Sequence, residues 1–221
     1  MMPALSNLIL YLDPANTDSY PGSGTTWFDL SGRGNNFTLV GSPTVSGGTV
    51  QFSGANYASA GDNDNLDPQY STVEVYTKGN SSTTPPHVTN IIGKGSWNTA
   101  YGVWFLAYSS GTRLTFVQGL STWGLGPYSA APPFDPGVWH QIVGTADGST
   151  VKLYIDGSLF STVSTNIGPR ALNDFAVEIA RSSYVNNYYA GQVGVVRMYD
   201  RGLSAAEVKQ NFDATRARYG I

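Results

Sequence analysis

The sequence predicts an all-β protein in which two antiparallel sheets form a sandwich that is closed by one C-terminal helix. Short apolar or alternating segments recur from residue 8 to residue 199, and Gly, Ser, Asn and Pro fill the connections between them. No helical segments alternate with these strands, as a parallel α/β fold would require. A helix-capping signal followed by a helical period comes only after residue 203.

Length and composition suit one domain over residues 1–221, with the sandwich at 1–203 and the closing helix at 204–219. The chain has no cysteine, which excludes a disulfide framework, a thiolate metal site and a cysteine nucleophile. Charged residues make up 12% and the net charge is −3, so we expect neither nucleic acid nor a membrane as a partner. The first residues lack the basic segment and long apolar core of a signal peptide, which predicts folding in the compartment of synthesis.

The expected strands follow from apolar patterning and turn residues, and a meander at 139–163 is the clearest of them. Val151, Leu153 and Ile155 alternate with polar neighbours, as in a half-buried strand. Asp147-Gly148 and Asp156-Gly157 flank this strand, and both pairs suit the positive φ angles of tight hairpin turns. The other expected strands are 8–12, 37–40, 49–53, 71–77, 88–93, 101–108, 113–118, 174–181 and 191–199.

The C-terminal helix is predicted by its capping residues. Ser204 is the expected N-cap, and Glu207 completes a capping box three residues later. Leu203 and Val208 flank this box as a hydrophobic staple, and Gly220 can end the helix. The narrow apolar stripe of the helix predicts a structural role, in which it covers one end or edge of the sandwich.

Three motifs in one order resemble a known family. The first is the turn at 27–36 (WFDLSGRGNN), the second is the hairpin from Trp139-His140 to Asp156-Gly157, and the third is the strand and helix start at 191–208. Together they are similar to laminin-G-like, concanavalin A-like lectin/glucanase domains. This resemblance implies a two-sheet antiparallel jelly-roll sandwich. Residues 8–13 and 19–27 are also similar to the opening of laminin-G-like domains in structural proteins of tailed bacteriophages.

The residues argue against catalysis. Glycosidases use a pair of carboxyl groups, and those of this fold take two or three from one strand. The chain has three glutamates, Glu74, Glu178 and Glu207, and none has another carboxylate two or three positions away. The resemblance to lyases of this fold would require a Gln-Ile-His strand, but residues 141–143 are Gln-Ile-Val. His87 and His140 are expected to be structural or simply exposed, so we expect no enzyme activity.

We expect no cofactor, and whether the chain binds a structural Ca²⁺ stays an open question. Asp62, Asp64 and Asp67 suggest a calcium loop, but an EF-hand needs Gly at its sixth position and Glu at its twelfth, and the chain has neither. We therefore expect an Asx-rich turn. The resemblance implies a Ca²⁺ that some relatives hold through an Asp on the closing strand, where this chain has Gly194. Asp13 and Asp29 are candidate ligands, or each caps a turn.

Aromatic residues in polar loops are the candidate binding residues. Sugars stack on exposed rings and bind nearby amides, so sugar contact, protein contact and local packing are the three interpretations of these loops. The candidates are Trp97, Tyr101, Trp123, Tyr128, Tyr184 and Tyr188. Trp27, Trp104 and Trp139 are expected in or beside the core, because of their strand neighbours.

The function that we predict is binding rather than catalysis. The resemblance implies a phage virion surface protein, either a capsid decoration (cement) protein or a short fibre-like protein. Its expected partners are other virion proteins, such as the major capsid protein, and cell-surface glycans. The first alternative is a free or secreted, extracellular carbohydrate-binding module of the lectin type, and a glycan hydrolase or lyase is the least favoured.

Overall fold

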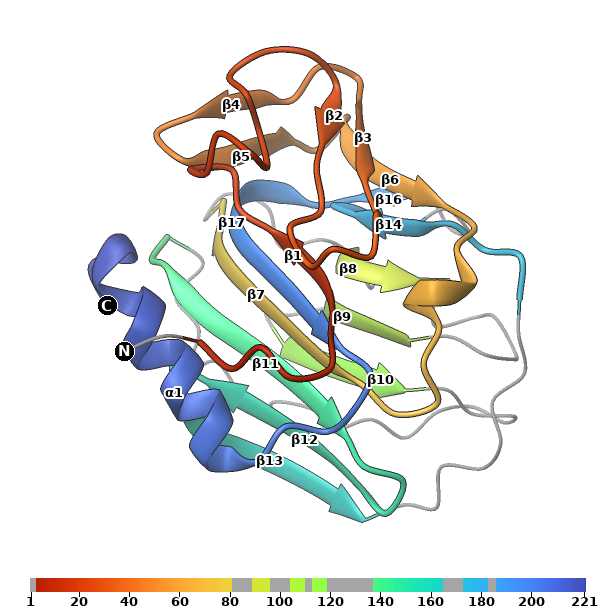
Figure 1. Cartoon of the computed structure of the whole chain (residues 1–221), viewed down its shortest axis with the longest axis vertical. Coiled ribbons are helices and arrows are strands. Elements are labelled where there is room, and N and C mark those ends of the chain that lie inside the picture. The colour runs from red at the N-terminus through yellow and green to blue at the C-terminus, as the bar shows by residue number, and fades with distance from the viewer. Residues whose placement is uncertain are drawn as a thin grey trace.

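The computed structural model describes residues 3–80, 89–95, 104–109, 113–118, 137–164, 173–182 and 186–221. Two antiparallel sheets pack face to face, and a single helix near the C-terminus lies along one of them (Figure 1). This architecture confirms the fold class that the sequence predicts.

Sheet A carries the helix and has the last long strand of the chain in its middle. In spatial order it contains β13 (Ser158–Ser164), β12 (Thr150–Ile155), β11 (His140–Ala146), β7 (Thr72–Gly79), β17 (Ala190–Tyr199), β5 (Thr49–Ser53) and β4 (Thr44–Ser46). The first half of β17 pairs with β5, and its second half pairs with β1 (Leu8–Leu12). A register shift between Val193 and Val196 in the pairing with β7 separates the two halves.

Sheet B forms the other layer. In spatial order it contains β10 (Arg113–Gln118), β9 (Trp104–Ser109), β8 (Thr89–Lys94), β14 (Val177–Ile179), β6 (Tyr57–Gly61), β3 (Phe37–Val40) and β2 (Thr26–Trp27). A small ribbon of β15 (Arg181–Ser182) and β16 (Asn187–Tyr188) follows β14 in the chain, and the 3₁₀ turn η1 (Asp64–Leu66) follows β6. The sequence did not predict β2, β4, β6 or β16, which are short.

The core fills the space between the sheets with large side chains. Trp27 and Trp104 are fully buried, as their strand neighbours predict, and the indole nitrogen of Trp104 donates to the carbonyl of Leu66 at 2.8 Å. The two sheets pack closely where the ring of Phe116 on β10 lies on Gly144 of β11. A Cβ atom at Gly144 would lie 2.0 Å from that ring, so only glycine fits there.

The two hairpins of the meander use their Asp-Gly pairs differently. Asp156 and Gly157 have φ angles of 51° and 74°, as a type I′ turn requires and as the sequence predicts. In the other turn only Gly148 has a positive φ, 94°, so the prediction for Asp147 was wrong. The carboxylate of Asp147 instead accepts the backbone N–H of Thr150 at 2.7 Å, which holds the turn from the side chain.

The helix begins where its capping residues predict. α1 (Ala205–Thr215) has Ser204 as its N-cap with a complete capping box, and the 3₁₀ helix η2 (Arg216–Tyr219) replaces the expected last turn. Glu207 also pairs with Arg201 at 2.6 Å. The hydrogen bond from Arg201 is the largest influence on Glu207; together with the hydrogen bonds of the cap it outweighs the opposing effect of burial and lowers the pKa of Glu207 to about 2.

The helix lies on the outer face of sheet A, along β11, β12 and β13 in Figure 1. The hydroxyl of Tyr76 on β7 donates to the carbonyl of Asn211 at 3.3 Å, and the hydroxyl of Tyr219 accepts the N–H of Val195 at 2.9 Å. The last residues therefore reach across to β17. Among the described residues, no helix is long and apolar enough to cross a membrane.

Candidate ligand-binding site

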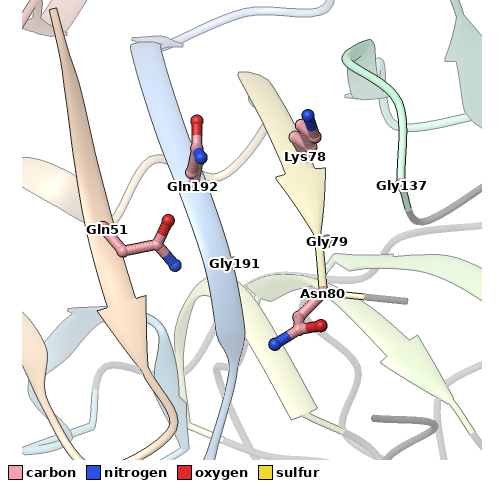
Figure 2. A pocket seen from close by; sticks show the side chains of 7 residues that line it. All are labelled: Gln51, Lys78, Gly79, Asn80, Gly137, Gly191 and Gln192. Atoms are coloured by element: carbon pink, nitrogen blue, oxygen red, sulfur yellow. The ribbon is translucent and has the colours of Figure 1, made fainter. Parts of the chain in front are cut away.

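A shallow hollow of 290 Å³ lies on the outer face of sheet A (Figure 2). Strands β5, β17 and β7 and the segment before β11 contribute to it. We call it the outer-face hollow, and it is lined by Gln51, Lys78, Gly79, Asn80, Gly137, Gly191 and Gln192. Its volume is just below the usual range for ligand pockets, about 300–1,000 Å³.

The register of sheet A aligns three of these side chains in a row. Gln192 on β17 lies opposite Gln51 on β5 and opposite Lys78 on β7. Side chains alternate between the two faces of a strand. Val50 and Val193 are buried in the core, so their neighbours Gln51 and Gln192 lie on the outer face, and Figure 2 shows Gln51 reaching toward β17.

The floor of the hollow is backbone. A Cβ atom at Gly191 would lie 2.5 Å from the hydroxyl oxygen of Tyr189 and 2.6 Å from the carbonyl oxygen of Lys78. Tyr189 occupies this space because its hydroxyl bonds Thr77 at 2.7 Å on the core side of the sheet. Position 191 therefore has no room for a side chain on the core side of the sheet, and at this position the hollow is lined by backbone.

The polar side chains of the row are largely free to bind a ligand. Within the described part of the chain, Lys78 makes no ion pair, and neither it nor Gln192 makes a side-chain hydrogen bond. The amide of Gln51 donates only to the neighbouring carbonyl of Phe52, at 3.1 Å. All three side chains are partly exposed. The row thus offers one ammonium group and two carboxamides, which can donate to and accept from a polar ligand.

An aromatic cluster stands beside the hollow. Tyr219 stacks on Tyr76 with ring centroids 4.7 Å apart and contacts the tilted ring of Trp139 at 4.6 Å. Tyr76 lies two residues before Lys78 on the same face of β7, a spacing of about 7 Å. Trp139 is partly exposed, in accordance with the prediction that it lies beside the core. These rings give the hollow a rigid neighbour on the helix side.

The structure describes only one of the six aromatic residues that the sequence singled out. Trp97, Tyr101, Trp123, Tyr128 and Tyr184 lie outside the described residues. Tyr188 does not reach the hollow.

Tyr188 instead takes part in local packing beside sheet B. The guanidinium of Arg181 lies 4.5 Å from the ring centre of Tyr57 and 5.6 Å from that of Tyr188. Arg181 also donates to Glu178 at 3.2 Å and to Asn186 at 3.1 Å. This cluster holds the β15–β16 ribbon against β6.

The glutamates have structural partners. Glu74 lies under the helix with no exposed surface, and it accepts hydrogen bonds from Gln141 at 2.8 Å, Arg197 at 3.0 Å and Asn211 at 2.8 Å. Glu178 is nearly buried and pairs with Arg181. His140 bonds Asp156 at 2.7 Å across the hairpin, a structural contact as expected. His87 lies outside the described residues.

The acidic loop is held by a lysine. The ammonium of Lys94 is fully buried and lies 2.9 Å from Asp62 and 3.2 Å from Asp67. The side chain of Asn63 accepts the N–H of Asn65 at 3.0 Å, as in an Asx turn. The loop is therefore the Asx-rich turn that the sequence predicts, and the ammonium of Lys94 lies between the carboxylates of Asp62 and Asp67.

Asp13 and Asp29, the other two candidate calcium ligands, also have structural partners. Asp29 accepts the N–H groups of Tyr11 and Ser31 at 2.9 Å, and Asp13 forms an ion pair with Arg218. Burial raises the pKa of Asp13, but its bonds to Arg218 outweigh that effect, so the net pKa is lowered. A Cβ atom at Gly194 would lie 2.1 Å from the hydroxyl of Tyr219, so an aspartate does not fit there. The described residues contain no group of three or more metal-ligating side chains.

A family model decides the relationship that the motifs suggest. The model described as "Concanavalin A-like lectin/glucanases superfamily" matches residues 52–209. The chain belongs to this superfamily. The matched region begins at Phe52. It therefore includes the described residues that line the outer-face hollow, except Gln51. No curated protein matches the chain in sequence.

Solved structures of this concanavalin A-like fold cover almost the whole chain. The binding domain of Paraclostridial Mosquitocidal Protein 1 has a TM-score of 0.72 at 15% identity, over 95% of this chain and 52% of that one. Domain 4 of AbnA, an extracellular arabinanase from Geobacillus stearothermophilus in complex with arabinotriose, has a TM-score of 0.69 at 15% identity, over 93% and 98%. Trypanosoma rangeli sialidase has a TM-score of 0.71 at 14% identity, over 98% and 34%. The chain thus spans about half of the first and a third of the last, and these identities show the fold alone.

Proposed function

We propose that this chain is a non-catalytic glycan-binding module, and that the outer-face hollow holds the sugar. The row of Gln51, Gln192 and Lys78 carries this proposal. Sugar hydroxyls donate and accept hydrogen bonds, and carboxamides do the same. The strands fix the row in place, and the glycines Gly79, Gly137 and Gly191 add backbone to the lining.

One structural comparison supports the proposal more than the others. The similarity to domain 4 of AbnA covers nearly all of both chains, and that domain was solved with arabinotriose. The toxin and the sialidase extend well beyond the matched region, so their ligands are not tied to the part that is similar to this chain.

The described carboxylates support a binding role rather than a catalytic one. Glycoside hydrolysis needs two carboxyl groups on either side of the scissile bond. The described residues that line the hollow include no Asp or Glu. Glu74 is bonded to Arg197 beneath the helix and has no exposed surface, so a substrate has no access to it.

A glycan array tests the proposal directly. We expect the protein to bind a defined set of oligosaccharides, and the double variant Gln51→Ala with Gln192→Ala to bind them about tenfold more weakly, because two hydrogen bonds are lost. Gln69→Ala is the matched control, since Gln69 is an exposed glutamine away from the hollow. An array without any bound glycan, or release of sugar products by the protein, would contradict the proposal.

We further propose that the module is displayed on a phage virion, as a capsid decoration protein or short fibre-like protein with the major capsid protein as its partner. The similarity of residues 8–13 and 19–27 to domains of phage structural proteins supports this assignment. The alternative is an extracellular lectin-like module. Peptide mass spectrometry of density-purified particles separates the two, because a free module is absent from such particles.

A further inference from the structure

Most of the basic residues whose side chains the structure describes, a set that leaves out Arg113 and Arg170, are ion-paired. Those within 4.0 Å of a carboxylate oxygen are Lys94, Lys152, Arg181, Arg197, Arg201, Lys209, Arg216 and Arg218. Within the same described part of the chain, Lys78 and Arg33 have no such partner. Arg33 is exposed in a glycine-rich turn, whereas Lys78 is partly buried and lines the outer-face hollow.

Among the described residues that line the hollow, Lys78 is therefore the one charged side chain, and no described carboxylate neutralises it. Its other polar side chains are Gln51, Asn80 and Gln192, which are uncharged. Partial burial lowers the effective dielectric constant around the ammonium of Lys78 and reduces its screening by salt. A cation in such a place attracts an anion more strongly than a cation on an open surface does.

We propose that the outer-face hollow selects saccharides that carry an anionic group, and that Lys78 binds this group. The inference rests on the proposed function, because it takes a sugar as the occupant. A hydrogen bond between an ammonium and an anionic oxygen is stronger than one between neutral groups. The anion therefore determines which sugars bind, and the carboxamides orient the rest of the molecule.

The register explains how one sugar engages the whole row. Lys78 and Gln192 are directly opposed on neighbouring strands, which places their Cβ atoms about 5 Å apart. An anionic group with two or three oxygens can accept from both the ammonium and the carboxamide at this separation. Gln51 lies one strand further, about 5 Å beyond Gln192, within reach of hydroxyls on the same ring or the next one.

The Arg181 cluster beside sheet B is a weaker candidate for binding an anionic group. Its guanidinium already donates to Glu178 and Asn186 and lies against two tyrosine rings. The charge of Arg181 is thus compensated by Glu178, while that of Lys78 is not.

A glycan array with matched neutral, carboxylated and sulfated oligosaccharides tests the inference. We expect the bound set to be enriched in anionic glycans, and Lys78→Met to weaken their binding about tenfold. Lys78→Arg keeps the charge and should retain most of the affinity. Lys152→Met is the control, because it removes the same charge from sheet A outside the hollow. Higher ionic strength should weaken binding by the native protein more than binding by Lys78→Met.

The outcomes separate this inference from the proposed function. A bound set with no enrichment in anionic glycans would overturn the role of Lys78 and leave the glycan-binding module intact. Equal binding of anionic glycans by the native protein and Lys78→Met would also overturn it. Absence of any bound glycan would overturn both. A preference for carboxylated over sulfated partners, or the reverse, identifies the source of the negative charge.

Discussion

The interpretation of Glu74 as a structural residue makes a strong prediction about stability. Glu74 is fully buried and accepts hydrogen bonds from Gln141, Arg197 and Asn211, so it joins the helix to two strands of sheet A. Glu74→Gln keeps the shape of the side chain but removes its charge and replaces one accepting oxygen with a donor. The guanidinium of Arg197, whose side chain is 3% exposed, then lacks its counter-ion.

The expected cost follows from this burial. Removal of one partner from a buried ion pair costs about 3–5 kcal/mol, because the remaining charge is left uncompensated in a medium of low dielectric constant. For a domain of this size, 1 kcal/mol corresponds to a shift of about 2–4 °C in Tm. Glu74→Gln should therefore lower Tm by about 6–20 °C.

A double-mutant cycle measured by urea denaturation tests this reasoning. Glu74→Leu combined with Arg197→Met should cost at least about 2 kcal/mol less than the sum of the two single changes, because the charges are removed together. The exposed helix pair Lys209–Asp213 is the control, with an expected coupling of about 0.3–0.5 kcal/mol. A cost below about 1 kcal/mol for Glu74→Gln, or additive effects in the cycle, would refute the structural role that we assign to Glu74.

Three further predictions concern other parts of the fold. Lys94→Met should cost about 3–5 kcal/mol in urea denaturation because it leaves the buried carboxylate of Asp67 without its cation, and a cost below about 1 kcal/mol would contradict this. The folded pKa of Glu207, about 2, is below its usual value of 4.5, so its stabilising effect is present above about pH 4.5 and is lost as the pH falls toward 2. Tm measured against pH should therefore decline less steeply below pH 4.5 in Glu207→Gln, and parallel curves would exclude this contribution. Gly144→Ala should destabilise the fold by about 1–3 kcal/mol because the new methyl group overlaps the ring of Phe116, whereas an unchanged urea midpoint would show that the sheets can move apart.

Local signals in the sequence were sufficient to predict most of the fold. The meander at 139–163 and the capped helix depend on neighbouring residues, so alternation, Asp-Gly pairs and the capping box predict them directly. Strand β6 has no such signal. Its residues 57–61 are small apart from Tyr57, and they form a strand because β3 and β14 lie on either side. Here tertiary pairing outweighs local preference.

The candidate site was beyond the reach of local patterns. Gln51, Lys78 and Gln192 are far apart in the sequence, and only the register of β5, β7 and β17 brings them into one row. The single local sign was the position of polar side chains on the outer face of otherwise apolar strands. The sequence did identify aromatic loops, but most of these lie outside the described residues, so their role in binding stays a prediction.

The position of β17 has a consequence for biosynthesis. Residues 190–199 form the middle of sheet A and pair with β1, β5 and β7, which all precede residue 80. While the ribosome is still producing residues before 190, β5 and β7 have open edges that can pair with other nascent chains. The sandwich can close only after residues 190–199 have been translated, so a stop codon before residue 190 should yield an aggregating fragment rather than a smaller folded protein.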